Sequence, residues 1–480
     1  MNKTDYLAQV ENLHASQQLR ERIAALPNAR KRSSRRFRPW MGACACLVAA
    51  VLGLTWLFPR LGMGGSSSAG AGHDEASTFM SYAGPVFPLT TLEDVNLTAE
   101  RHITLDFAPW QDGNSTKIEV KDSYVLTNPT DADQTVTLVY PFAGSFYELY
   151  PVTLTADGTE LETAIYPGVG GNQSVESWEE YAAIIKGGDL TAAHQEAPTL
   201  DTPVTVYSFT DFVLPESDAI APTLAVTYPW SEDAPAVLTY GFDGSGIDEE
   251  AGWAQRHFSL PGSNSPHAED PRLLIVVGDP LEEYTIQGYQ DGGCTPGEEL
   301  AGVSAHVTQY QSTLGNVLDS LCQAPDTLDQ KYGKPMGVLA LPRAVFFDTL
   351  RKSFGTSIPS NMTMLEMVFE WCNIQERIFY GEATLTIPAG ENITIEASFI
   401  KEGSYDFMCA HTENRGIYGY DLLTQLGSNL SCTEQTATLE DRGLIRIARQ
   451  NFGFDLYSGI NTVTLDPSTE HYYLEVRRAF

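Results

Sequence analysis

Hydrophobic residues form one uninterrupted run near the start of the chain, at residues 40–58. The run reads WMGACACLVAAVLGLTWLF, holds no charged residue, and is flanked by Arg38 and Arg60. A helix of this length is about 28 Å long, close to the hydrocarbon thickness of a bilayer. We therefore predict a single transmembrane helix at residues 40–58, which divides the chain into a short N-terminal part and a long C-terminal part.

The N-terminal part has the apolar spacing of helices. Residues 4–26 predict two short helices with a break near His14. In the second helix Leu19, Ile23 and Leu26 recur at spacings of four and three, which places them on one face. Helices this short are marginal alone, so the face needs a partner. A cytoplasmic protein and the inner surface of the membrane are both candidates.

Small residues recur every four positions inside the predicted transmembrane helix, at Ala45, Ala49 and Gly53. This spacing lets two helices approach closely and favours a homodimer, although small residues are also common in membrane helices that do not associate. Residues 59–78 are rich in Gly and Ser and have no apolar period. We expect a flexible linker there.

After the linker the pattern becomes the alternation typical of β-strands. The clearest alternating stretches are residues 117–126 and 134–140, on either side of a turn at 128–133, and residues 383–387 and 393–399, on either side of Pro388-Ala389-Gly390. We expect each pair to form a hairpin. The stretch 259–270 is rich in Pro, Ser and acidic residues, and we expect a boundary there. The prediction is a first antiparallel β-sandwich-like domain at 79–262 and a second at 270–480.

Helical inserts are expected within both domains. One begins after Ser177, where Ser177 and Glu180 form a capping box, and another begins at a second capping box of Thr363 and Glu366. The expected helices of the second domain are residues 312–322, 344–354 and 363–375, an insert of 312–377. The fold class is therefore mainly β with helical inserts (α+β), preceded by N-terminal cytoplasmic helices and one transmembrane helix.

The charge is distributed very unevenly and sets the expected orientation. The chain has a net charge of −33. Residues 1–40 carry +6, so about −40 falls on residues 61–480. Positive residues stay on the cytoplasmic side, so residues 1–39 are expected inside the cell and residues 59–480 outside it. A cleaved signal peptide is less consistent with the 39 residues that precede the apolar run. The acidic exterior argues against a nucleic-acid partner.

Motifs that could carry chemistry lack the required spacing or setting. Asp131, Asp133 and Thr135 match a phosphatase motif, but they fall in a turn and not at the end of a buried strand. The acidic stretch 243–250 fails the spacing of a calcium loop. Cys409 and His411 have no second pair for zinc. We therefore expect no catalytic residue, metal or cofactor, and a protein that is not an enzyme; an extracytoplasmic enzyme is the alternative class.

Five of the seven cysteines follow the transmembrane helix at irregular spacing. They are Cys294, Cys322, Cys372, Cys409 and Cys432. An odd number leaves at least one of them free. We interpret most of them as small buried apolar residues, with room for one disulfide.

Aromatic residues suggest a binding surface. Tyr405, Tyr418 and Tyr420 lie close to Asp421 in a stretch that is also rich in glycine. Rings beside a carboxylate can form a platform for sugars or peptides. The same residue types are also ordinary components of a β-sandwich core. Both interpretations are open at this point.

Two parts of the chain resemble known proteins. The pattern YLxxVxxLHAS…LxxRI, followed by a basic run and one membrane helix, resembles the start of membrane anti-sigma factors. Their zinc-binding His/Cys pattern is absent, because His14 stands alone. The segments GGCTPGEE (292–299), CAHTENRGIYGYD (409–421) and NFGFDL (451–456) resemble surface proteins of Clostridia-type Gram-positive bacteria.

These observations lead to one main hypothesis and one alternative. The main hypothesis is a single-pass protein of the cell membrane that binds or senses a polymer or protein of the cell envelope. In the alternative, residues 4–26 bind a cytoplasmic sigma factor, as the anti-sigma resemblance implies, and the outer part controls its release.

Overall fold

The computed structural model describes residues 79–480, apart from residues 114, 169–174, 215–218, 220, 232–233, 261–271, 324–340, 357–362 and 407–413. Asp74–Phe480 forms one compact unit. The expected N-terminal helices, the transmembrane helix at 40–58 and the linker at 59–78 lie outside the described residues. No helix in the described part is both long enough and apolar enough to cross a bilayer.

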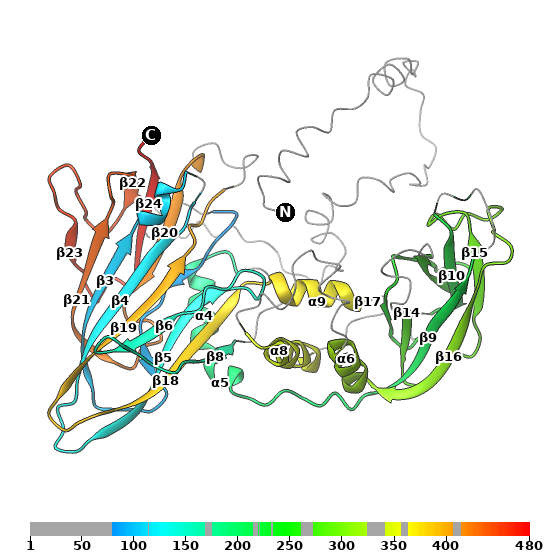
Figure 1. The fold of residues 1–480 in the computed structure, drawn as a ribbon, viewed down its shortest axis with the longest axis horizontal. Coiled ribbons are helices and arrows are strands. Elements are labelled where there is room, and N and C mark those ends of the chain that lie inside the picture. Colours follow the sequence, from blue (N-terminus) through cyan, green and yellow to red (C-terminus); the bar gives the residue numbers. More distant parts are fainter. Residues whose placement is uncertain are drawn as a thin grey trace, which may run out of the picture. The chain divides into compact units, whose positions relative to one another are not determined.

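The described chain is mainly β, as the alternation predicts, and its strands form five sheets (Figure 1). The largest sheet has the strand order β23 (Thr462–Thr464), β21 (Ser431–Glu440), β3 (Thr98–Asp106), β4 (Ile118–Thr127), β19 (Asn392–Lys401), β6 (Thr153–Ala156) and β7 (Thr159–Glu160). A second sheet has the order β2 (Thr90–Thr91), β5 (Gln134–Gly144), β18 (Arg377–Ile387) and β8 (Ala164–Pro167). A third has the order β1 (Pro85–Val86), β20 (Tyr418–Leu423), β24 (His471–Arg478) and β22 (Ile445–Gln450).

The remaining two sheets come from the middle of the chain. One has the order β16 (Ser304–Thr313), β9 (Pro203–Val213), β14 (Arg272–Val277), β11 (Val237–Tyr240) and β17 (Thr363–Met364). The other has the order β12 (Gly244–Asp248), β13 (Trp253–Ser259), β10 (Thr223–Pro229) and β15 (Thr285–Tyr289). The helices are η1 (Ala108–Gln111), α4 (Trp178–Lys186), α5 (Asp189–Ala193), α6 (Leu314–Gln323), α8 (Arg343–Thr356) and α9 (Leu365–Ile374).

The two expected hairpins do not form. β4 pairs with β3 and β19, whereas β5 pairs with β18 and β2 in a different sheet. The strands on each side of the turn at 128–133 therefore lie in opposite layers, and β18 and β19 are separated in the same way. Tyr140 of β5 and Phe399 of β19 meet across the layers, with ring centroids 5.6 Å apart. Alternation shows that one face of a strand is buried, but not whether the next strand lies beside it or opposite it.

The turns fold across the layers because Asn128 is buried and joins them. Its side-chain amide donates hydrogen bonds to the carbonyls of Ala132, Ile387 and Pro388. Asp133 in turn accepts a hydrogen bond from the amide N–H of Ala389. Each turn thus supplies polar partners for the other, which keeps both at one edge of the layered sheets.

Strand pairing crosses the expected domain boundary. β5 and β18 lie side by side although more than 230 residues separate them, as the cyan and yellow strands of Figure 1 show. The sheets of the middle segment also contain strands from both sides of 262–270, because β9 pairs with β14 and β10 pairs with β15. The two consecutive domains expected at 79–262 and 270–480 therefore do not correspond to the pairing. Residues 203–364 interrupt the other three sheets as an insert.

The two capping boxes have different outcomes. Ser177 accepts a hydrogen bond from the amide N–H of Glu180 at the start of α4, so the Ser177 cap is confirmed. The carboxylate of Glu180 accepts from the amide N–H of Glu176 and not, as in a capping box, from that of Ser177. The second prediction is wrong, because α9 begins after Met364 without a side-chain cap. The carboxylate of Glu366 accepts instead from the amide N–H of Gly241, at the end of β11. Tertiary contact outweighs the local signal there.

Candidate functional site

The residues proposed as a binding surface lie in and beside β20; Tyr420 is buried, and Tyr405, Tyr418 and Asp421 are half-buried. Tyr420 is 2% exposed and donates a hydrogen bond to the carbonyl of Thr116 at 2.6 Å. Tyr418 packs edge-on against Trp110. Successive residues of a strand point to opposite faces, so Tyr420 and Asp421 cannot share one surface. A flat platform of rings beside the carboxylate is therefore not formed.

These residues receive another part of the same chain, residues 79–86. The backbone of Ser81 exchanges two hydrogen bonds with Tyr405, and β1 runs parallel to β20. Phe79 is 5% exposed and lies against Gly419, where a Cβ would come within 2.6 Å of its ring. Residues 79–86 follow the expected linker directly. We call them the entry segment.

Polar side chains fix the entry segment in place. The hydroxyl of Tyr82 donates to Asp421 Oδ2 at 2.5 Å, and the amide N–H of Ala83 donates to Ser404 Oγ at 2.9 Å. The ammonium group of Lys401 donates to the carbonyl of Ala83. The entry segment is therefore held by backbone pairing, by an aromatic contact and by side-chain hydrogen bonds.

Burial shifts the pKa values of the ionisable groups around this contact. Burial and the nearby Asp421 raise the pKa of Tyr82 well above its usual value. Burial lowers the pKa of Lys401 to about 8, against the opposing effect of Asp421. Burial raises the pKa of Glu376 to about 7, and Lys401 opposes that shift. The contact thus contains groups that change charge near neutral pH.

A histidine and a tryptophan cover the other side of Asp421. His471 Nε2 lies 3.3 Å from Asp421 Oδ2, and His471 is 3% exposed. The indole of Trp178, at the start of α4, stacks on the imidazole with ring centroids 4.7 Å apart. Asp421, whose side chain is 14% exposed, therefore contacts both Tyr82 and His471.

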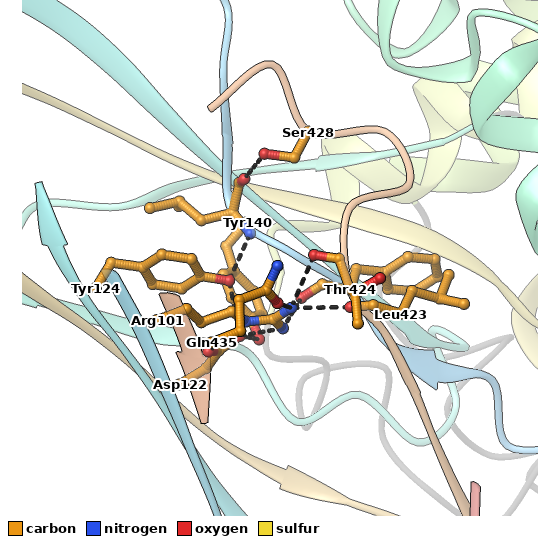
Figure 2. A network of polar contacts seen from close by, with 10 residues as sticks. Arg101, Asp122, Tyr124, Tyr140, Leu423, Thr424, Ser428 and Gln435 are labelled. Carbon is orange, nitrogen blue, oxygen red and sulfur yellow. Dashed lines mark hydrogen bonds and ion pairs between the residues drawn. The ribbon is translucent and has the colours of Figure 1, made fainter. Parts of the chain in front are cut away.

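A second polar cluster lies in the core between the layers (Figure 2). Arg101 of β3 and Asp122 of β4 form a bidentate ion pair at 2.9 and 2.7 Å, with both side chains fully buried. Tyr124 and Tyr140 both donate hydrogen bonds to Asp122 Oδ2. Burial alone would lower the pKa of Arg101, but Asp122, Tyr124 and Tyr140 together raise that pKa above its usual value.

The remaining donors of Arg101 hold two chain segments. Its guanidinium donates to the carbonyls of Leu423, Thr424 and Phe87. The hydroxyl of Tyr124 accepts from the amide N–H of Leu89. The cluster therefore joins the largest sheet to the segments that follow β1 and β20. A buried charge whose hydrogen bonds are all made serves to fix a structure, and it leaves no group free for a substrate.

The other sequence motifs are accounted for by local structure where they are described. Asp243 Oδ2 accepts from the amide N–H of Ser259, and Asp248 accepts from that of Ala251. Cys294 and Cys372 are buried free thiols. Cys409 and His411 lie outside the described residues. Within the described ranges, no group of three or more His, Cys, Asp or Glu side chains could hold a metal ion.

Sequence reasoning missed the residues that organise these clusters. Asp122 lies in the inward row of β4 with Ile118, Val120, Tyr124 and Leu126, which are all buried. A charge in an otherwise apolar inward row is a signal of a buried ion pair, because an unpaired charge there would be too costly. Arg101 occupies the same kind of position in β3, between Ala99 and Ile103. The sequence therefore contained this signal.

Comparison with known proteins adds little. No protein-family model matches the chain, and no curated protein matches it. A solved structure from Legionella pneumophila, provisionally named a nutrient binding protein, aligns with a TM-score of 0.29 and 5% identity over 82% of this chain and 70% of that one. A TM-score this low does not show a shared fold.

Proposed function

We propose that this protein is a single-pass membrane protein whose acidic, β-rich part lies outside the cell and binds or senses at the cell envelope without catalysis. The uncharged run at 40–58 is the anchor, and the basic residues before it keep the N-terminus in the cytoplasm. The two layered groups of sheets then form an extracellular part of β-sandwich type.

The observation that supports this proposal best is the way the entry segment joins the fold. Residues 79–86 follow the expected anchor and linker, and they are built into the third sheet through Tyr405, Gly419 and Asp421. If residues 79–86 were as flexible as the expected linker, the fold could unfold or rotate independently of the anchor. In this proposal the entry segment is part of the fold and follows the linker directly. A mechanical force on the fold, or a partner bound to it outside the cell, therefore acts directly on the linker.

Anchoring is tested by removing the apolar run. The full chain and a variant that lacks residues 40–58 are expressed in a Gram-positive host and separated into membrane and soluble fractions. We expect the full chain to stay with the membrane after washing with high salt and alkaline carbonate, and to be released by detergent. The variant should leave the membrane fraction.

A matched control keeps the length and changes only the polarity. Replacing Leu47 and Leu52 by Arg leaves the chain length unchanged but makes a span unfavourable by about 2.5–3.5 kcal/mol for each Arg. The control should behave like the deletion. Retention of both variants in the washed membrane would contradict the proposal, because the chain would then associate by some other region.

A further inference from the structure

Two buried arginines of this protein have very different surroundings. Arg101 is 2% exposed and has a bidentate carboxylate partner. Arg256 of β13 is 1% exposed, and no carboxylate pairs with it among the described residues. Its Nε donates to the hydroxyl of Tyr228 at 3.3 Å and its Nη2 to the carbonyl of Val237 at 3.4 Å, both long contacts. Nη1 makes no hydrogen bond with any residue of the described ranges.

This arrangement needs a further partner. A guanidinium group cannot lose its proton in a protein, so Arg256 cannot become neutral as a buried lysine can. A buried charge without a counter-charge is strongly unfavourable. Tyr228 and Val237 offer only neutral acceptors. Among the described residues, the group that would complete this arrangement and is absent is therefore an anion.

Arg256 lines a small cavity that is partly open to the surface. Its other walls include Tyr228, Trp230, Pro235, Val237 and Leu281, and its volume is about 20 Å³. Trp230 belongs to the same wall, and its Nε1 is also buried without a hydrogen-bond partner among the described residues. Space of this size accommodates about one water molecule or the end of a larger ligand. A whole sugar or nucleotide is too large.

The chemistry of the walls selects one kind of group. Arginine binds carboxylates through two parallel N–H donors, and an indole N–H adds a third. The rings of Tyr228 and Trp230, with Pro235, present apolar surface to whatever is attached to the charged end. We propose that this cavity binds the carboxylate of a small organic acid or of a peptide C-terminus. If the protein acts as proposed above, this site is a place where it meets an envelope ligand.

The test measures binding to the full chain in detergent micelles by calorimetry. The probes are acetate, its neutral isostere acetamide, and a Gly-Gly-Phe peptide with a free or an amidated C-terminus. We expect saturable binding at one site by acetate or by the free peptide, and at least tenfold weaker binding by the neutral analogue. The stronger of the two binders shows whether the source is a small acid or a chain end.

Three variants distinguish this cavity from general charge effects. Arg256→Gln should lower affinity at least tenfold, and Trp230→Phe, which keeps a ring but removes the N–H, should lower it severalfold. Arg446→Gln removes an exposed arginine of β22 and should leave binding unchanged. If Arg256→Gln does not fold, Arg256→Lys is used instead. It keeps the positive charge but lacks the two parallel N–H donors of a guanidinium group, and it should still weaken binding at least tenfold.

Two results would overturn the inference. One is the absence of saturable carboxylate binding, or binding that Trp230→Phe and Arg256→Lys leave unchanged. The other is binding that appears only when Glu232→Gln and Asp233→Asn remove two carboxylates. In that case one of these carboxylates, and not an external anion, would supply the counter-charge of Arg256 in the native chain. Membrane fractionation is independent of both, so a failure here would leave the anchoring proposal standing.

Discussion

Tyr82 donates a 2.5 Å hydrogen bond to Asp421, a residue 339 positions further along the chain. The contact joins the entry segment to β20, and Asp421 also lies beside His471 of the neighbouring strand β24. The sequence left open whether Asp421 and the nearby tyrosines bind an external ligand or belong to the core. In the structure Asp421 and Tyr405 contact the segment through which the chain enters the fold, whereas the rings of Tyr418 and Tyr420 pack against Trp110 and Phe107.

Replacement of Tyr82 by Phe should loosen the entry segment. Hydrogen bonds to a charged group contribute about 1.5–3 kcal/mol, and the substitution keeps the ring. We expect the free energy of unfolding to fall by about 1–2 kcal/mol, and protease cleavage near residue 80 to become faster. Tyr457→Phe is the control, because Tyr457 is fully exposed and its loss should change neither quantity. Equal behaviour of the two variants would show that the Tyr82 contact contributes nothing.

A methyl group at position 419 should push Phe79 out of its site. The Cβ of an alanine would lie 2.6 Å from the ring of Phe79, which is too close for any real contact. Overpacking of this kind costs about 1–3 kcal/mol, and we expect Gly419→Ala to lower the melting temperature accordingly. Gly246→Ala is the matched control in β12, since its Cβ would meet nothing within 4 Å. A Gly419→Ala variant as stable as the control would contradict the packing.

Stability should depend on the protonation of Glu376. Burial, together with the nearby Glu402 and Glu148, raises its pKa to about 7 in the folded state against the opposing effects of Lys401 and Arg377. Between about pH 4.5, the ordinary value, and pH 7, the folded protein binds a proton that the unfolded chain has lost. The free energy of unfolding should therefore fall as the pH rises through this window.

The variant Glu376→Gln removes this dependence. Its free energy of unfolding, measured by urea denaturation at half-unit steps from pH 4.5 to 8, should fall less steeply with pH than that of the native chain. Relative to the native chain, the variant should gain stability towards pH 8, where the native carboxylate is charged. Parallel pH profiles for the two proteins would refute the assignment.

Breaking the Arg101–Asp122 pair from one side should be among the most damaging single changes. Asp122→Asn leaves the guanidinium buried without its counter-charge, and such changes cost about 3–5 kcal/mol. The double variant Arg101→Met with Asp122→Leu removes both charges and should be less destabilised than the sum of the single variants Arg101→Met and Asp122→Leu. Denaturant unfolding of the four proteins measures the coupling. Strict additivity would mean that the pair acts as two independent residues.

Alternation along the sequence was enough to find most strands but not their neighbours. The alternating run that starts at residue 117 is β4 and the one that starts at 134 is β5, yet they lie in different layers. The deciding interactions are those of Asn128 with Ile387 and Pro388, about 260 residues away. No local pattern contains that information. The same limit explains why the expected boundary at 259–270 does not match the strand pairing.

The candidate site shows a similar division between local and long-range information. The cluster of aromatic residues around Tyr418 and Tyr420 was visible in the sequence, but its occupant was not, because the entry segment is more than 300 residues away. Arg256 lies in the inward row of β13 between Ala254 and Phe258, so the sequence signalled a buried charge but not whether a carboxylate pairs with it. Its importance depends on the absence of a carboxylate among the described residues around it, which only the three-dimensional arrangement shows.

The central claim is that the folded part lies outside a membrane that the chain crosses once. Labelling of single introduced cysteines on intact cells tests it most directly, with an impermeant maleimide and with the native chain as the background control. Tyr457→Cys places a thiol at a fully exposed position of the fold, and Ser33→Cys places one in the basic segment before residue 40. We predict that Tyr457→Cys is labelled on intact cells and that Ser33→Cys is labelled only after lysis. Labelling of Ser33→Cys on intact cells, or protection of Tyr457→Cys until lysis, would contradict the account.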